Sequence, residues 1–238
     1  MLLIPLLLWG SLASAQTVGT VQTYSGDVKL ERAASPVAVT TGMGVMRGDR
    51  FTTGANGRLI ILLNDKSTLD LYDSGVLVLN DQVLGTNGQA TTRVSLLSGV
   101  LRSIVHVTTG GPAPNFEVHT PNAIAAARGT DYNTGYQTNT TRKGYTHCRD
   151  FTDVYTRHGT VEVTSLGAPG TQVMLKKDQS TTVACAGAPL PVNPGMGALG
   201  LYGTVGALGL EGAIVGGFAG AGGFSNSSNP PPPVSPYH

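Results

Sequence analysis

Short apolar and alternating runs, separated by turn residues, fill the chain from Val18 to about Cys185. Residues 67–72 (STLDLY), 116–119 (FEVH) and 161–164 (VEVT) alternate between apolar and polar positions. A period of two places one face of a strand in a core and the other face in water. These runs therefore predict half-buried β-strands.

Two other segments need a separate interpretation. Residues 58–63 (RLIILL) are apolar without alternation, which predicts a central strand covered on both faces. Residues 122–127 (NAIAAA) are rich in alanine and fit either a strand or one or two helical turns. No part of this region keeps a period of 3.6 residues, so we expect no long helix.

Turn residues recur along the same region at the roughly 8–12-residue spacing that is typical of sandwiches, barrels and solenoids. The turn signals are Ser25-Gly26-Asp27, Arg47-Gly48-Asp49, Ala55-Asn56-Gly57, Asp73-Ser74-Gly75, Asn87-Gly88, Ser98-Gly99, Arg128-Gly129 and His158-Gly159. The sequence thus predicts an all-β fold, with many short strands in one solenoid-like or sandwich-like domain over residues 16–188.

Composition changes abruptly after Cys185. Residues 189–194 are rich in proline and predict a linker, and residues 195–224 consist almost entirely of glycine, alanine, leucine and other apolar residues. Within that segment GALGL occurs at 197–201 and again at 206–210. Two interpretations stay open: a flexible or self-associating low-complexity tail, and a membrane helix. Residues 225–238 are rich in proline and predict a disordered end.

The first 15 residues have the pattern of a signal peptide. An apolar run from Leu2 to Trp9 precedes Ala13-Ser14-Ala15, the small-x-small form of a signal-peptidase site. The alternative is a membrane anchor, although the run is too short to span ~30 Å of hydrocarbon. We therefore expect export to the periplasm or cell surface, with membrane association through the glycine-rich tail left open.

The chain contains two cysteines, Cys148 and Cys185. An oxidising compartment outside the cytosol would pair them as a disulfide. Two buried free thiols are the alternative. Neither cysteine lies in a C-x-x-C motif or beside a histidine-rich stretch, and His147 is a single histidine next to Cys148. Metal or redox chemistry is therefore not indicated.

Composition gives little support for catalysis or for nucleic-acid binding. Charged residues make up 12% of the chain and the formal net charge is +1, so no broad field attracts nucleic acid. The sequence lacks the G-x-S-x-G elbow, the P-loop and the H-E-x-x-H motif, and it has no G-x-G-x-x-G at a strand-to-helix junction. We predict no enzyme activity, no cofactor and no metal site. The histidines are scattered, at His106, His119, His147, His158 and His238.

Four carboxylates lie close together in the sequence and invite a calcium or glycosidase interpretation: Asp65, Asp70, Asp73 and Asp81. The calcium ligand series of an EF-hand is absent, and a sequence cannot show the separation of two carboxyl groups. Asp65 and Asp73 instead resemble turn residues that bond the nearby backbone. The Arg47-Gly48-Asp49 tripeptide is likewise ordinary turn chemistry, and we assign it no integrin-like role.

Two longer stretches resemble the FecR domain of bacterial envelope proteins. Residues 42–54 (GMGVMRGDRFTTG) and 56–67 (NGRLIILLNDKS) are similar to G-x-x-L-x-x-G-D-x-I-x-T-G and G-x-A-x-L-x-L-x-D-G-S. Residues 116–123 (FEVHTPNA) and 128–132 (RGTDY) are similar to F-x-V-x-T-P-x-A and R-G-T-x-F. Weaker similarity at 94–101 and 158–163 extends the resemblance over about residues 17–182.

The resemblance implies an extracytoplasmic domain of short strands, which in signalling relatives relays the state of an outer-membrane transporter to a sigma factor. This chain has no cytoplasmic anti-sigma segment before the domain, so direct sigma-factor control is not expected. We predict a non-catalytic envelope or surface module that binds a protein or wall polymer, with a possible part in signal sensing. The alternatives are a structural protein that assembles through its tail and a glycan-acting hydrolase.

Overall fold

The computed structural model describes residues 17–84, 89–107, 111, 113 and 115–196. Seventeen strands occupy these residues, and no helix occurs in them. The predicted all-β fold is thus confirmed. The proposed signal peptide (1–15), most of the glycine-rich segment (195–224) and the proline-rich end (225–238) lie outside the described residues. No helix suited to crossing a membrane is found in the part of the chain that the structure describes.

The strand bounds are β1 (Thr17–Ser25), β2 (Val28–Arg32), β3 (Ser35–Val37), β4 (Gly44–Met46), β5 (Arg50–Thr53), β6 (Arg58–Leu63), β7 (Thr68–Leu71), β8 (Val76–Leu84), β9 (Ala90–Ile104), β10 (Asn115–His119), β11 (Ala123–Ala127), β12 (Asp131–Gln137), β13 (Phe151–His158), β14 (Val161–Ser165), β15 (Gln172–Leu175), β16 (Gln179–Ala184) and β17 (Asn193–Pro194).

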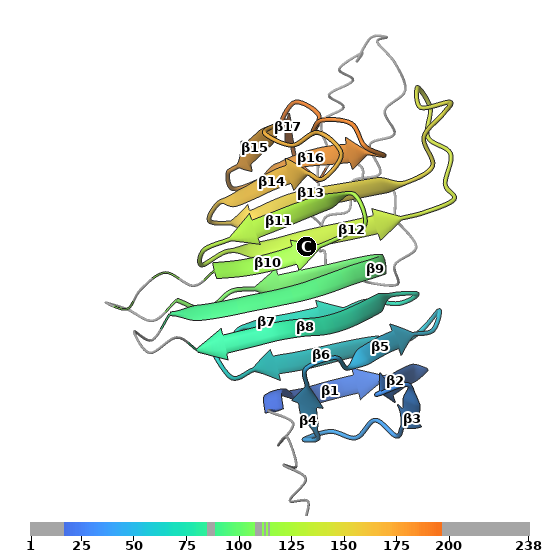
Figure 1. The fold of residues 1–238 in the computed structure, drawn as a ribbon, viewed down its shortest axis with the longest axis vertical. Coiled ribbons are helices and arrows are strands. Elements are labelled where there is room, and N and C mark those ends of the chain that lie inside the picture. The colour runs from blue at the N-terminus through green and yellow to red at the C-terminus, as the bar shows by residue number, and fades with distance from the viewer. Residues whose placement is uncertain (1–16, 85–88, 108–110, 112, 114, 197–238) are drawn as a thin grey trace, which may run out of the picture.

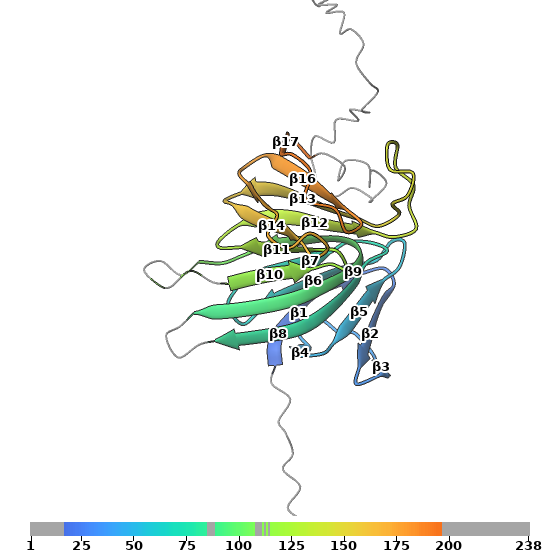
Figure 2. The ribbon, with the colours of Figure 1, turned by 45° about the horizontal axis from the view of Figure 1, so that its top comes forward.

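These strands form two facing layers (Figures 1 and 2). Sheet A has the order β4, β1, β6, β7, β9, β12, β13, β16, β17. Sheet B has the order β3, β2, β5, β8, β9, β10, β11, β14, β15. Strand β9 belongs to both sheets, because its first part pairs with β8 and β10 and its last part with β7 and β12. The chain therefore winds as a flattened two-sheet stack.

The passage of β9 from one sheet to the other occurs at Gly99. This residue has φ 82°, and a Cβ atom there would lie 2.6 Å from the Cα of Gly75. Only glycine fits such a conformation and so close an approach of two backbones. At the same corner the Thr53 hydroxyl donates to the Tyr72 carbonyl at 2.6 Å and accepts from the Gly75 amide at 2.8 Å. Gly75 and Gly99 thus mark one corner between the layers.

The core lies between the two sheets and follows the predicted period of two. In β10 Phe116 and Val118 are buried, and in β14 Val161 and Val163 are buried, each alternating with half-buried residues. These side chains join one hydrophobic cluster contributed by both sheets. Burial of apolar area at roughly 25 cal/mol per Å² is the main force that holds the layers together.

Two sequence predictions about individual strands change here. The prediction that residues 58–63 are covered on both faces is wrong, because Leu59, Ile61 and Leu63 are buried while Leu62 is 37% exposed. Strand β6 lies between β1 and β7, but only its inner face packs on the core. The ambiguous segment 122–127 is a strand, β11, whose alanines face the core at alternate positions.

Asp49 is a structural residue of the Arg47-Gly48-Asp49 turn. Its carboxylate is fully buried and accepts from Arg32 Nε and Nη2, both at 2.7 Å. It also accepts from the Met46 amide at 2.8 Å. We expect Asp49→Ala to lower the free energy of unfolding by about 1.5–3 kcal/mol, because a guanidinium and a backbone amide lose a charged acceptor. Urea denaturation of the two proteins measures this loss.

Arg47→Ala is the matched control from the same turn. Arg47 donates to the Asn80 carbonyl in an exposed position, and its removal should change stability by under about 0.5 kcal/mol. Equal losses from the two variants would contradict a structural role that is specific to Asp49.

Candidate functional site

The loop between β12 and β13, residues 138–150, is the most distinctive local feature of the described chain. It extends beyond the ends of both strands at one side of the stack (Figure 1). A backbone bridge between Arg142 and Tyr145 and a hydrogen bond from the Thr140 amide to the Arg149 carbonyl at 3.1 Å give it internal structure. We call residues 138–150 the anchored loop, because side chains fix its base to sheet A.

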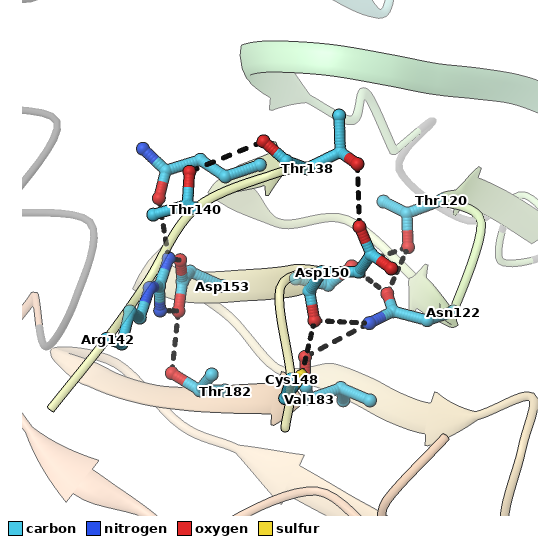
Figure 3. A network of polar contacts seen from close by, with 12 residues as sticks. Thr120, Asn122, Thr138, Thr140, Arg142, Cys148, Asp150, Asp153, Thr182 and Val183 are labelled. Carbon is cyan, nitrogen blue, oxygen red and sulfur yellow. Dashed lines mark hydrogen bonds and ion pairs between the residues drawn. The ribbon is translucent and has the colours of Figure 1, made fainter. Parts of the chain in front are cut away.

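The first anchor is a buried ion pair between Arg142 and Asp153 of β13 (Figure 3). The guanidinium donates to both carboxylate oxygens, from Nη1 at 2.9 Å and from Nη2 at 2.5 Å. The two side chains are 12% and 2% exposed. Asp153 also accepts from the Thr182 hydroxyl at 2.6 Å, and Arg142 donates to Gln137 at 2.9 Å. A charged pair with so many hydrogen bonds is geometrically specific.

Aromatic contacts complete this anchor. The Arg142 guanidinium carbon lies 4.2 Å from the centroid of the Phe151 ring, and the Tyr145 ring meets Phe151 edge-on at 5.4 Å between centroids. Phe151 is fully buried but does not belong to the core between the sheets. Its strand neighbour Asp153 alternates with core-facing Val154. The anchored loop therefore covers part of the outer face of sheet A.

The second anchor is the disulfide between Cys148 and Cys185, whose Cα atoms lie 5.7 Å apart. The predicted pairing is thus present. Beside it, the Cys185 amide donates to the Asp150 carbonyl at 2.8 Å, and Thr138 donates to the Asp150 carboxylate at 2.6 Å. Asn122 donates to the Val183 carbonyl at 3.2 Å and accepts from the Thr152 hydroxyl. Figure 3 shows most of these groups converging at the base of the loop.

The anchored loop carries exposed basic groups. Lys143, His147 and Arg149 are exposed, and residues 139–149 contain no Asp or Glu. None of these three side chains has a hydrogen bond or ion pair with another described residue. The loop is thus fixed at its base by Arg142–Asp153 and Cys148–Cys185, while these basic side chains are exposed to solvent.

A second polar surface lies on the outer face of sheet A, where arginines pair with carboxylates across strands. Arg58 binds Asp70 through two hydrogen bonds at 2.9 and 2.8 Å, and Arg102 binds Asp131 at 2.9 and 2.7 Å. The pKa values of Arg58 and Arg102 are raised by these hydrogen bonds. Because each of these arginines is compensated by a carboxylate, this part of sheet A carries less net positive charge than the anchored loop.

Tyr72 lies beside these pairs. The Arg58 guanidinium is 5.3 Å from its ring centroid, and burial, followed by the negative charge of Asp70, raises the pKa of the phenol. Both causes favour the neutral phenol, which stays protonated at neutral pH. The arrangement is that of a structural cross-strand network.

The four clustered carboxylates of the sequence do not form a common site. Asp65 accepts from the Ser67 amide at 2.9 Å, which confirms it as a turn residue. Asp70 is in β7 and pairs with Arg58, Asp73 is in the turn before β8, and Asp81 is in β8. Among the described residues no group of three His, Cys, Asp or Glu side chains could hold a metal ion. His119 contacts Glu117 at 2.7 Å.

Sequence reasoning missed the Arg142–Asp153 pair. The only available signal was an aspartate in the middle of an otherwise apolar and hydroxyl-rich strand, residues 151–156 (FTDVYT). Such a charge needs a partner if it is buried. Nothing in the spacing of Arg142 and Asp153 identifies that partner before the loop is folded.

Comparison with known proteins gives one family match. Residues 49–162 match the family model described as FecR protein, which confirms the resemblance seen in the sequence over a shorter span than 17–182. This match includes the whole anchored loop and Asp153 but not Cys185. No curated protein matches the sequence of this chain.

Two crystal structures of a candidate anti-sigma factor from Parabacteroides distasonis ATCC 8503, at 2.50 and 1.65 Å resolution, are similar to this chain. Both share 15% sequence identity with it, and the TM-scores are 0.46 and 0.47. The aligned parts cover 63% and 64% of this chain and 61% and 64% of the solved chains. This chain therefore spans less than two thirds of the length of either solved protein.

Proposed function

We propose that this chain, whose residues 49–162 match the FecR protein family model, is a non-catalytic module of the cell envelope that binds another macromolecule and takes part in signal sensing. The partner is an envelope protein or a wall polymer with anionic groups. The anchored loop is the proposed contact. One observation carries the proposal: the loop is fixed at its base by Arg142–Asp153 and by Cys148–Cys185, while Lys143 and Arg149 are exposed.

The architecture supports binding at this place. A structural loop with no function is commonly short or variable in conformation, whereas loops that carry function are positioned by a rigid scaffold. Here the scaffold is the outer face of sheet A, and two independent anchors hold the loop on it. Two exposed cationic side chains on an anchored loop favour association with an anionic partner at low salt.

The disulfide supports a location in the cell envelope, outside the cytosol. Disulfides persist in oxidising compartments such as the bacterial periplasm and are rare in the cytosol. Cys148–Cys185 therefore fits an exported protein, as does the signal-peptide pattern of residues 1–15. We also propose that the chain is not an enzyme; of the four clustered carboxylates, Asp65 and Asp73 lie in turns, Asp70 pairs with Arg58 and Asp81 lies in β8.

Charge reversal at Lys143 and Arg149 of the anchored loop tests this function. The full chain, expressed with its own leader in an envelope-containing bacterium, is cross-linked in cells and purified with its covalently attached partners. We expect Lys143→Glu/Arg149→Glu to reduce capture of the main partner about tenfold, because two attractive contacts become repulsive and tenfold corresponds to about 1.4 kcal/mol. Raising the salt concentration should weaken capture by the unmodified chain in the same direction.

Lys66→Glu/Arg128→Glu is the matched control. Both residues are exposed and lie in turns at the opposite end of the sheet A strands. This variant makes the same charge change and should capture the partner normally. Equal capture by the loop variant and the control would contradict the proposal, and so would turnover of a glycan or peptide by the purified chain.

A further inference from the structure

The two sheets end in four edge strands, and one of them, β15, differs from the others in how its backbone groups are protected. Strands β4 and β3 close sheets A and B near the N-terminal end, and β17 and β15 close them near the C-terminal end (Figure 1). An edge strand presents unpaired backbone N–H and C=O groups that can pair with another chain. Most natural edges carry a device that prevents this.

Three of the four edges have such a device. In β4 the Gly44 carbonyl accepts from Arg32 Nη2 at 2.9 Å, and the Met46 amide donates to Asp49 at 2.8 Å. Strand β3 has three residues and contains Pro36, which has no N–H to donate. Strand β17 has two residues, one of which is Pro194. These edges are short, and side chains or prolines occupy their pairing groups.

Strand β15 has no such device. Its residues Gln172–Leu175 include no proline and no charged residue, and they pair only with β14, from Thr164↔Gln172 to Val161↔Leu175. No other backbone hydrogen bond involves these four residues in the described chain. In an antiparallel pair every second residue directs its N–H and C=O away from its neighbour. Two residues of β15 therefore offer four backbone groups to an added strand.

The side chains of β15 define what kind of strand fits. Leu175 is buried and Val173 packs against the core, so Gln172, Met174 and Lys176 lie on the outer face. Met174 is 50% exposed, and Lys176 is exposed just beyond the strand. An added strand would gain most from an apolar residue opposite Met174 and an acidic residue opposite Lys176, since such cross-strand pairs stabilise a sheet.

We propose that β15 is a docking edge for an extended segment of a partner protein in which apolar and acidic residues alternate. This inference rests on the proposed binding function and names a second contact for it. Main-chain hydrogen bonds supply affinity and the Met174 and Lys176 positions supply selectivity. A second copy of this chain fits less well, because β15 contains no acidic residue to meet Lys176, and residues 197–238 contain a single one, Glu211.

Binding of two labelled peptides to the full chain tests this inference. The probes are a blocked eight-residue peptide of alternating valine and glutamate and its counterpart of valine and lysine, followed by fluorescence anisotropy. We expect the acidic peptide to bind about fivefold tighter than the basic one, as one favourable cross-strand ion pair allows. Lys176→Glu should invert this preference. Lys29→Glu, at an exposed residue of β2 on the same sheet, should leave it unchanged.

The outcomes separate this inference from the proposed function. Peptide binding without charge preference, or a preference that Lys176→Glu does not change, would overturn the docking edge. A dimer of the full chain in sedimentation that Met174→Lys dissociates would overturn it in favour of a second copy. If the docking edge fails while Lys143→Glu/Arg149→Glu still reduces capture in cells as expected, the proposed function stands. If that capture test fails while the peptides bind as expected, only the proposal that the anchored loop contacts the partner is rejected.

Discussion

Asp153→Ala is expected to lower the free energy of unfolding by about 3–5 kcal/mol, which is the range for removing one partner of a buried ion pair. The variant leaves the Arg142 guanidinium, 12% exposed, without the carboxylate that accepts two of its hydrogen bonds. The Thr182 hydroxyl loses its acceptor as well. Urea denaturation followed by circular dichroism measures the loss.

Asp131→Ala is the matched control, because Asp131 also pairs with an arginine of sheet A through two hydrogen bonds. This pair is more exposed, at 29% and 18% for its two side chains, and solvent screening should limit the loss to about 1 kcal/mol. The double variant Arg142→Met/Asp153→Leu should recover much of the stability lost by Asp153→Ala, since both charges are then removed. Equal losses for the two single variants would contradict a burial effect.

Removal of the disulfide is expected to lower the free energy of unfolding by an amount similar to that of Asp153→Ala. Cys148 and Cys185 are separated by 37 positions in the sequence, and the chain-entropy model assigns closure of such a loop about 4 kcal/mol. We expect the Cys148→Ser/Cys185→Ser variant to lose about 4 kcal/mol of its free energy of unfolding. Its urea midpoint should therefore be lower. Its β-rich far-UV spectrum should be retained in the absence of urea, because the core between the sheets does not include the cysteines.

Limited trypsin digestion provides a local measure of the same change. The exposed Lys143 and Arg149 lie in the anchored loop, and loss of the second anchor should speed cleavage there relative to Lys29 or Lys66. Reduction of the unmodified chain should reproduce both effects. Identical unfolding of the oxidised and reduced chains would show that the disulfide adds no stability.

The strands could be predicted because their periodicity depends on local burial. Residues 116–119 and 161–164 alternate in sequence and in the structure, since one face of each strand packs on the same core. The prediction for residues 58–63 was wrong, because Ile60 and Leu62 are apolar but face outward. An apolar residue on a solvent-facing position cannot be recognised from the run alone.

The assignment of the strands to the two sheets could not be predicted from the sequence. Strand β9 joins two sheets, and its change of sheet at Gly99 depends on the close approach of Gly75. The sequence indicated a turn at Ser98-Gly99, whereas the chain continues as a strand through that bend. Which strands share a layer is decided by long-range packing that no local pattern encodes.

The candidate site was predictable only in part. The pairing of Cys148 with Cys185 followed from their number and from the expected export of the chain. The Arg142–Asp153 pair depends on the anchored loop folding back over sheet A, and no helix or strand spacing rule links these two positions. The edge at β15 could not be distinguished from β3, β4 and β17 until the hydrogen bonds of each edge were known.

The central claim is that the anchored loop meets the partner, and a photoreactive amino acid at position 147 of the full chain tests it most directly. His147 is exposed between the two anchors. Irradiation of cells should link position 147 to one macromolecule of the envelope, while the same amino acid at position 66 should give no such product. The claim would be contradicted if position 66 formed the adduct and position 147 did not, or if the adduct at 147 were equally abundant in the Lys143→Glu/Arg149→Glu background.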